Sequence, residues 1–335
     1  MTDMRRRAFL AVAAGAAGSL SPKAQAQSGR PRRVAWLGLG HADHWSPYLE
    51  SLRAGLREWG WVEGENLIIR AYWASGREDM EGVARELLAA NPDVVVTQEF
   101  MVFPVKALTS TVPIVIGFSG DPVPVKLMES HRRPGGNITG MTYLALVLVG
   151  KRIELLKELV PEARRLAILA RPQHPGDPLE RQASEEVVRK LGMELSYFPY
   201  VSPSFLPARE FSPLEKTFEL IRQARCDALV VFPDSAMFEI SDRVAQFAIA
   251  ERLPSVSGWA PFAKNGLLMT YGPNVRGLYK SLGRYVDRIL RGASPADLPF
   301  EVPTTIELVI NAKTAKALGL TIPPTLLARA DEVID

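Results

Sequence analysis

Polar and aromatic side chains directly follow many of the short apolar runs in this sequence. Aromatic rings suit a flat or apolar ligand body, whereas Arg171 and the N–H groups of helices starting near Ser119 and Ser235 suit a carboxylate. The candidate ligand-binding residues are His41, His44, Trp45, Gln98, Glu99, Phe100, Phe118, Ser119, Asp121, Tyr143, Arg171, Asp234, Ser235, Trp259 and Tyr271. About half of these aromatic side chains could instead fill the core, and sugars also stack on aromatic rings. We expect a small organic acid or amino-acid-like ligand with an apolar or aromatic part.

Three patterns with catalytic residue types are incomplete. In GFSGD at 117–121, the second glycine comes one residue too early for a nucleophile elbow. His41 and His44 could hold a metal with Asp43, but a stable site usually needs a further well-placed ligand. The single cysteine, Cys226, excludes an internal disulfide and a cysteine-based metal site. We therefore predict no catalytic residue and no metal.

Two glycine-rich stretches fail as nucleotide-binding motifs. GLGHAD at 38–43 has Asp43 where a dinucleotide fingerprint needs its third glycine. GGNITGM at 135–141 has Met141 where a phosphate-binding loop needs lysine, so it is better explained as a turn leading into a strand. The sequence predicts no cofactor.

Alternating strands and helices must position these side chains. Short, continuous apolar runs begin at Arg33, Leu67, Asp93 and Ile114, and segments 47–59, 78–90 and 123–131 between them show helical spacing. Buried strands separated by helices indicate a parallel sheet covered on both faces. A second series starts at Lys151 and repeats this order as far as Ser257.

The repetition predicts an α/β fold with two doubly wound parallel-sheet lobes joined by a hinge. We expect one lobe at 32–142 plus about 275–292, and the other at 143–272 plus about 296–335. Hinge positions are expected near Thr142–Tyr143 and Gly272–Pro273. Open α/β sheets bind ligands beyond the carboxyl ends of their strands, so two facing lobes predict a cleft between them.

The first 26 residues have the features of an export signal. Arg5, Arg6 and Arg7 precede a mildly apolar run, and the small residues Ala24 and Ala26 mark a cleavage site after Ala26. RRAFL at 6–10 is similar to the twin-arginine consensus, which favours that export route. No cysteine follows the apolar run, so we expect no lipid anchor and a free periplasmic product.

Charge argues against nucleic acid and membrane surfaces as partners. The formal net charge of +3 is carried entirely by residues 1–26, and the remainder sums to zero. An uncharged chain has no long-range field to attract phosphate backbones or anionic lipids.

Several long strings resemble those of ABC transporter substrate-binding proteins of the tryptophan-binding-protein-like family. They are GLREWGWVEGENL at 55–67, DPV at 121–123, RPGGNITG at 133–140, KRIELLK at 151–157, YGPN at 271–274 and ELVINAKTAKALGL at 307–320 followed by ADEVI at 330–334. The likeness covers about residues 32–335. It implies a type I periplasmic-binding-protein-like fold without enzymatic activity, whose partners are a small-molecule ligand and an ABC permease with its ATPase, and we expect a monomer.

The chain departs from the family pattern at two loops expected to face the cleft. After the third strand it has QEFM at 98–101 where small residues are usual, and Arg171–Pro172 replaces the usual Asn–Pro. The ligand of a relative therefore cannot be transferred directly. A ligand-sensing subunit of a membrane signalling complex would use the same fold, and an exported α/β enzyme would need a nucleophile and base that the sequence does not reveal.

Overall fold

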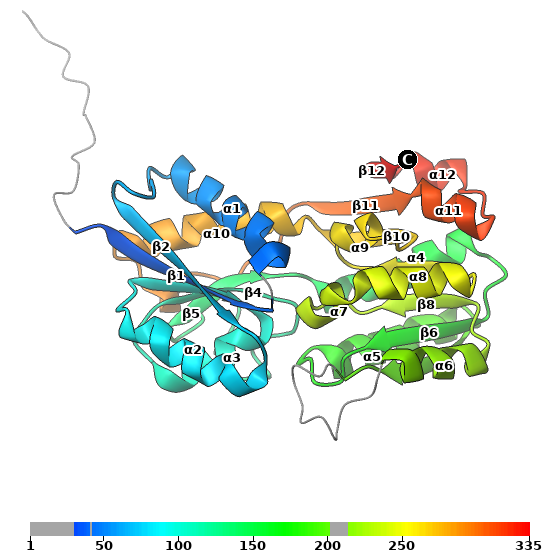
Figure 1. The fold of residues 1–335 in the computed structure, drawn as a ribbon, viewed down its shortest axis with the longest axis horizontal. Helices are drawn as coiled ribbons and strands as arrows, with labels where there is room; N and C mark the ends of the chain where they lie inside the picture. Colours follow the sequence, from blue (N-terminus) through cyan, green and yellow to red (C-terminus); the bar gives the residue numbers. More distant parts are fainter. Residues whose placement is uncertain (1–29, 41, 202–213) are drawn as a thin grey trace, which may run out of the picture. The chain divides into compact units, whose positions relative to one another are not determined.

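Two β-sheets organise the chain in the computed structural model, which describes residues 30–40, 42–201 and 214–335 (Figure 1). The predicted export signal and His41 lie outside the described residues. Within the described ranges, no helix is both long enough and apolar enough to cross a membrane.

The first sheet has the strand order β2-β1-β3-β4-β5, and all of its pairings are parallel. Its strands are β1 (Arg32–Leu39), β2 (Leu67–Ala74), β3 (Val94–Gln98), β4 (Ile114–Phe118) and β5 (Ile138–Thr142). Val34 and Trp36 pack on one face, while Ala35 and Leu37 pack on the other. This alternation follows from the period of two in a strand, and it explains the continuous apolar runs.

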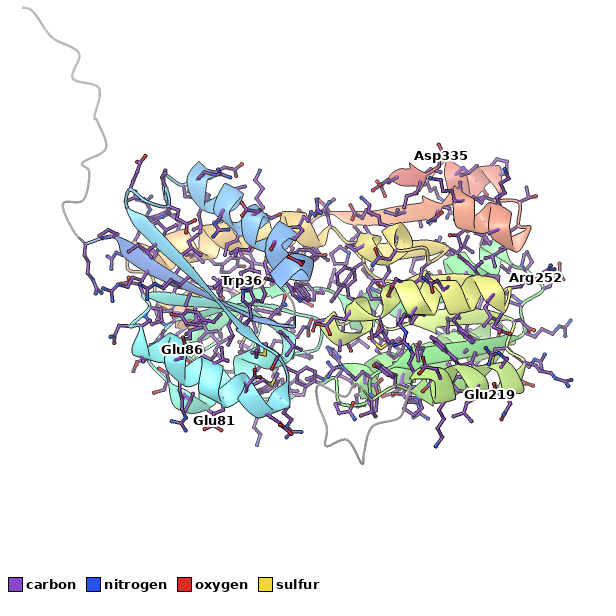
Figure 2. The ribbon with its side chains drawn as sticks, in the orientation of Figure 1. Trp36, Glu81, Glu86, Glu219, Arg252 and Asp335 are labelled. Carbon is purple, nitrogen blue, oxygen red and sulfur yellow. The ribbon has the colours of Figure 1, made fainter. Side chains whose placement is uncertain are left out.

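Four helices cover the first sheet. They are α1 (Ala42–Glu58), α2 (Arg77–Ala89), α3 (Val102–Leu108) and α10 (Val275–Leu290). The first and last of these share a core cluster with Trp36, and the other two share a cluster with Leu37. In Figure 2, Trp36 lies in the interior, whereas Glu81 and Glu86 extend from the outer side of α2.

The second sheet has the order β12-β11-β10-β9-β8-β6-β7. Its strands are β6 (Arg165–Ala170), β7 (Glu194–Pro199), β8 (Ala228–Val231), β9 (Ser255–Ser257), β10 (Met269–Pro273), β11 (Ile306–Asn311) and β12 (Glu332–Ile334). The pairing of β10 with β11 is antiparallel, so this sheet is mixed and not purely parallel as predicted. The reason is that α10, the helix between β10 and β11, packs on the first sheet, so the chain returns to the second sheet without a helical crossover on that sheet.

In the described ranges, eight helices accompany the second sheet. They are α4 (Ala145–Leu159), α5 (Asp177–Lys190), α6 (Leu214–Ala224), α7 (Ser235–Glu239), α8 (Ser241–Ala250), α9 (Ala260–Lys264), α11 (Ala312–Leu318) and α12 (Pro324–Leu327). The core cluster that includes Trp36 continues from the first sheet to one face of the second, where it includes Leu169 and Val231. A single apolar core therefore reaches both sheets.

The helix predicted at 123–131 does not form. Turns replace it, with Leu127 donating to the carbonyl of Pro122, and Lys126 adopts a left-handed φ of 58°. Pro124 lacks a backbone donor, and prolines on both sides of the segment disfavour a continuous helix.

Helices α1 and α10 approach closely at two glycines. A Cβ atom on Gly55 would lie 2.0 Å from the carbonyl oxygen of Lys280, and one on Gly283 would lie 2.8 Å from the carbonyl carbon of Gly55. Small residues at a helix crossing let the backbones come closer than the usual 8–10 Å between axes.

We predict that Gly55→Ala lowers the free energy of unfolding by about 2 kcal/mol, because the added methyl must push two backbones apart. Urea-induced unfolding measures the effect. Gly82→Ala is the matched control, since Gly82 lies within α2 with no atom within 4 Å of the added carbon, and it should raise stability by up to about 1 kcal/mol. An equally stable Gly55→Ala variant would contradict this packing.

Candidate functional site

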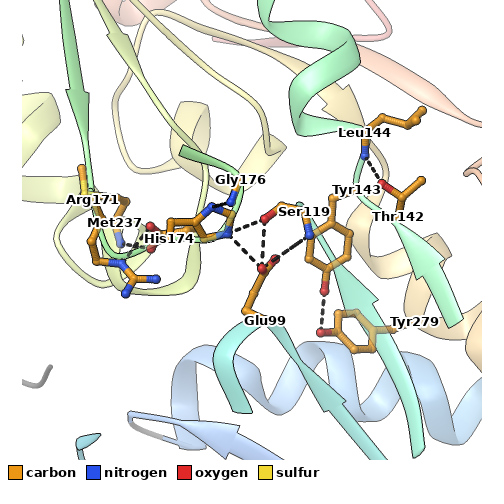
Figure 3. A network of polar contacts seen from close by, with 11 residues as sticks. Glu99, Ser119, Thr142, Tyr143, Leu144, Arg171, His174, Gly176, Met237 and Tyr279 are labelled. Atoms are coloured by element: carbon orange, nitrogen blue, oxygen red, sulfur yellow. Dashed lines mark hydrogen bonds and ion pairs between the residues drawn. The ribbon is translucent and has the colours of Figure 1, made fainter. Parts of the chain in front are cut away.

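A buried polar network joins residues that follow strands of the two sheets (Figure 3). Glu99 follows β3 and Ser119 follows β4, while His174 lies in the loop after β6. The Ser119 hydroxyl lies 2.6 Å from Nε2 of His174 and donates to Oε2 of Glu99 at 2.9 Å. The same carboxylate oxygen lies 3.0 Å from Nε2 of His174. Two loops of the first sheet thus meet one loop of the second.

Glu99 has an unusual backbone for its residue type. Its φ is +47°, and its side chain is 1% exposed. A non-glycine residue in this left-handed region is uncommon, and such conformations concentrate at functional sites, where the surroundings must hold them. Here the backbone N–H of Ser119 also donates to the Glu99 carboxylate, at 3.2 Å, so the strained residue is fixed by its acceptor contacts.

His174 lies in the network and not in solvent, although it belongs to a loop. It is 5% exposed, and its Nδ1 accepts the backbone N–H of Gly176 at 3.1 Å. That bond places the ring proton on Nε2, which faces Glu99. Burial lowers the His174 pKa, but the hydrogen bond and charge of Glu99 outweigh burial, and the net shift is upward.

Serine, histidine and glutamate are the residue types of a hydrolytic triad, but their connections differ from one. In a triad, the serine contacts one ring nitrogen and the carboxylate contacts the other. Here Ser119 and Glu99 both contact Nε2, and Nδ1 is held by a backbone donor. The Ser119 hydroxyl also donates to the carboxylate, so the histidine and the carboxylate do not act in series as they do in a triad.

Arg171 and Asp234 form a second buried contact beside the network. Nε of Arg171 donates to Asp234 at 3.0 Å, and both side chains are at most 3% exposed. The other oxygen of Asp234 caps α7 by accepting the N–H of Met237 at 2.9 Å. Phe100, from the first sheet, lies under the guanidinium with 4.3 Å between Cζ and the ring centroid. A cation is thereby placed between a carboxylate and an aromatic face.

Aromatic rings from both sheets also meet, and we call this set the aromatic seam. It consists of Trp36, Trp45, Tyr48, Tyr143, Phe238, Trp259, Phe262 and Tyr279. Trp45 on α1 faces Phe238 on α7 with ring centroids 6.3 Å apart, and Tyr143 faces Trp259 edge-on at 5.4 Å. The indole N–H groups of Trp45 and Trp259 are buried without a hydrogen-bond partner among the described residues.

A chain of hydroxyl contacts ties the seam to the strand ends. The hydroxyls of Tyr143 and Tyr279 lie 2.8 Å apart, and Tyr279 donates to the side-chain oxygen of Gln98. Burial raises the pKa of both tyrosines well above the ordinary value, and the nearby Glu99 adds to the effect. Both phenols therefore remain protonated and serve as hydrogen-bond donors.

The structure brings together most, but not all, of the residues singled out from sequence. The network, its Arg171 contact, the hydroxyl chain and the seam include Gln98, Glu99, Phe100, Ser119, Tyr143, Arg171, Asp234, Trp45 and Trp259. Four others lie elsewhere. Phe118 is fully buried in a core cluster, and Asp121 contacts His131 at 3.0 Å near the surface. Ser235 is buried at the start of α7, and Tyr271 lies in β10, where its carbonyl accepts a hydrogen bond from Arg152. His41 lies outside the described residues, and the side chain of His44 is not described.

Sequence reasoning missed Trp36, Phe238 and Phe262 of the seam, and four polar contributors as well. Tyr48 and Tyr279 lie on amphipathic helices, where a tyrosine on the buried face is indistinguishable from an ordinary core residue. His174 follows Arg171 by three residues, so its position in the same cleft-facing loop was the available signal. Glu239 is the fourth, and it ends α7.

The side chains beside the network pack closely in the second sheet's loops. The space lined by Arg171, His174, Asp177, Glu180 and Asp234 has no room for a water molecule. A neighbouring groove of about 380 Å³ is lined on one side by Phe100 and on the other by Gln173, and this volume is in the range of small-molecule sites. Among the described residues, no group of three or more His, Cys, Asp or Glu could hold a metal ion.

Glu239 carries a buried carboxylate oxygen that has no hydrogen-bond partner among the described residues. This oxygen lies against Gly40, at the end of the first strand, since a Cβ atom there would be 1.8 Å away. Burial, and next the negative charge of Asp234, raise the pKa of Glu239 to about 7, while Arg171 opposes the shift.

We predict that Glu239→Gln stabilises the protein at pH 8 by on the order of 2 kcal/mol and leaves it unchanged below pH 4.5. A raised carboxyl pKa means that the folded state holds its proton more tightly than the unfolded state. The wild type therefore loses stability as the pH rises from about 4.5 to about 7, whereas glutamine does not titrate. Thermal unfolding of both proteins across this range measures the difference, and parallel pH profiles would contradict it.

Comparisons with known proteins give one consistent family. A family model described as ABC transporter substrate binding protein matches residues 44–334. A protein of Clostridioides difficile strain R20291 named tyrosine-binding protein is 24% identical over 213 residues, which are 63% of this chain and 58% of that protein. This chain thus matches somewhat more than half of that relative's length.

Solved structures share the fold. A conserved domain protein from Vibrio cholerae is 24% identical with a TM-score of 0.82, covering 91% of this chain and all of that one. An ABC domain from Streptococcus pneumonia in complex with L-Trp is 22% identical with a TM-score of 0.80, at the same coverage. The two neighbours establish the type I periplasmic-binding-protein-like architecture of this chain.

Proposed function

Because this chain belongs to the family of ABC transporter substrate binding proteins, we propose that it captures a small organic ligand in the periplasm for an ABC importer. The ligand is amino-acid-like or an aromatic or organic acid, and it binds between the two sheets. The protein is a monomer that delivers the ligand to a permease with its ATPase, and it performs no chemistry on the ligand.

The observation that carries this proposal is the meeting of both sheets at the network and the aromatic seam. Each sheet contributes polar groups at its strand ends, and each contributes rings to the seam. A ligand held there would contact both halves at once, so that binding favours their approach. The connectivity around Ser119, in which the histidine and the carboxylate do not act in series as in a triad, supports a binding role over a hydrolytic one.

Two relatives support the aromatic part of the ligand. The Clostridioides difficile relative is named for tyrosine, and the Streptococcus pneumonia structure contains L-Trp. Flat side chains of these ligands pack favourably against aromatic rings, each contact adding about 0.5–1.5 kcal/mol beyond area burial. The rings of this chain's seam suit such a ligand.

We predict that calorimetry against aromatic amino acids, aromatic amines, aromatic acids, aliphatic amino acids and sugars detects an aromatic ligand with a Kd of about 1 μM or tighter. Trp259→Phe should weaken that binding about tenfold or more, because the smaller ring loses contact area. Trp59→Phe is the control, since Trp59 is 44% exposed and should bind as the wild type. A sugar as the only binder, or an unchanged Trp259→Phe, would argue against the proposal.

We predict export by the twin-arginine route. Replacing Arg6 and Arg7 by lysine should leave uncleaved precursor in the cytoplasm, because that route reads the arginine pair. Immunoblots of cell fractions measure the ratio of precursor to mature protein. Replacing Arg5 alone is the control and should have little effect. Normal processing of the double variant in a strain that lacks this translocase would instead indicate the general secretory route.

A further inference from the structure

We infer that Glu99 determines which class of ligand binds. Its carboxylate occupies the position beside the donors of Ser119 where a ligand carboxylate would bind. The site therefore takes an aromatic amine that presents no carboxylate there. This inference rests on the proposed function: it keeps the aromatic part of that ligand and replaces its carboxylate by an amine. The geometry of three buried groups supports it.

First, the donors of Ser119 are already used. Its backbone N–H and its hydroxyl both donate to the carboxylate of Glu99, and Nε2 of His174 completes the set. A backbone N–H, a hydroxyl and an imidazole N–H are the donors that a bound carboxylate would require. A ligand carboxylate at this position would have to displace a residue that is 1% exposed and tethered to the chain.

Second, the nearest guanidinium already has a carboxylate partner. Arg171 donates to Asp234 from Nε and lies over the ring of Phe100. Arg152, the other buried guanidinium of this region, donates to Glu180 at 3.1 Å and to the carbonyl of Tyr271. Each arginine therefore has one carboxylate partner in the chain itself, and Nη2 of Arg152 has no hydrogen-bond partner among the described residues.

Third, the acidic side chains around the site outnumber the arginines. Glu99 faces His174, Asp234 faces Arg171 and Glu180 faces Arg152. Glu239 adds a carboxylate with a buried oxygen that no described hydrogen-bond donor reaches. Removing a carboxylate from water is costly unless a cation or several donors compensate it, and an ammonium group on the ligand supplies that charge.

The rings beside Glu239 suit the same ligand. Phe238 precedes it in the chain and faces Trp45 across the two sheets. An ammonium group is attracted to an aromatic face, in addition to its attraction to a carboxylate. The indole N–H groups of the seam each offer one neutral donor, which matches an uncharged oxygen better than a carboxylate that needs two or three.

Calorimetry with two matched sets of probes tests the inference. The sets are tryptamine, L-tryptophan and indole-3-acetate, and tyramine, L-tyrosine and 4-hydroxyphenylacetate. We expect the wild type to bind the amine of a set at least about tenfold more tightly than the amino acid, and to bind the acid weakest. Equal or tighter binding of either carboxylate ligand by the wild type would overturn the inference, and this ranking needs no variant.

Substitution at position 99 supplies the reverse experiment. Glycine adopts a φ of +47° without strain, so Glu99→Gly should open the Ser119 donors and increase affinity for the amino acid about tenfold or more. Glu99→Gln keeps the position filled and should show no such gain, and Ser119→Ala added to Glu99→Gly should reduce it. A Glu99→Gly protein that melts as the wild type but gains no affinity for the amino acid would overturn the inference.

The binding measurements distinguish a wrong ligand class from a wrong role for Glu99. If neither the wild type nor any variant binds any of the six probes, the aromatic ligand class is wrong and the inference falls with it. If the wild type binds the amino acids most tightly, the aromatic ligand class stands and only the role of Glu99 is wrong.

Discussion

The meeting of the two sheets depends on one constraint: the buried carboxylate of Glu99 needs hydrogen-bond donors from both of them. Glu99 is withdrawn from water and held in a left-handed backbone conformation, and each of these features costs on the order of 1 kcal/mol or more. Its carboxylate accepts hydrogen bonds from Ser119, which follows a strand of the same sheet, and contacts His174, which follows a strand of the other sheet. Were the two sheets to separate, Glu99 would lose the histidine contact, so its burial is coupled to the approach of the two halves.

The strings that carry the family resemblance mostly build the frame around this contact. Trp61 donates its indole N–H to Asp287 on α10 at 2.9 Å, and Asn137 donates to the carbonyls of Thr109 and Val112. Arg152 links α4 to β10 and α5, with burial lowering its pKa and raising that of Glu180 to about 7. These contacts fix helices and loops relative to strands. These contacts build the frame, whereas the loop at 98–101 contributes Glu99 to the polar network.

The order of elements could be predicted from sequence because each buried strand is a short apolar run and each helix has its own period. The antiparallel pairing of β11 in the second sheet could not be predicted in this way. The neighbour of β11 depends on how the chain returns from α10. His174 shows the same limit at the level of a side chain. Its neighbours in sequence are those of an ordinary loop, and its burial comes from Glu99, 75 positions away. Residues at strand ends were found because topology places strand ends together, whereas Tyr279 and Glu239 required the packing of helices.

The dense packing beside the network has a consequence for how a ligand enters. The loops around Arg171, His174 and Asp234 leave no room for a water molecule, so under the proposed function a ligand would enter only when the two halves move apart. Opening breaks the contacts of His174 with Glu99 and Ser119 and separates Phe100 from Arg171. A ligand stabilises the closed form only by the difference between its affinities for the closed and open forms. Contacts that already hold the halves together lower the free energy of closing. Less of the ligand's interaction energy is then needed to close the protein, and the ligand binds more tightly. The same contacts slow release, because they must break again before the ligand can leave.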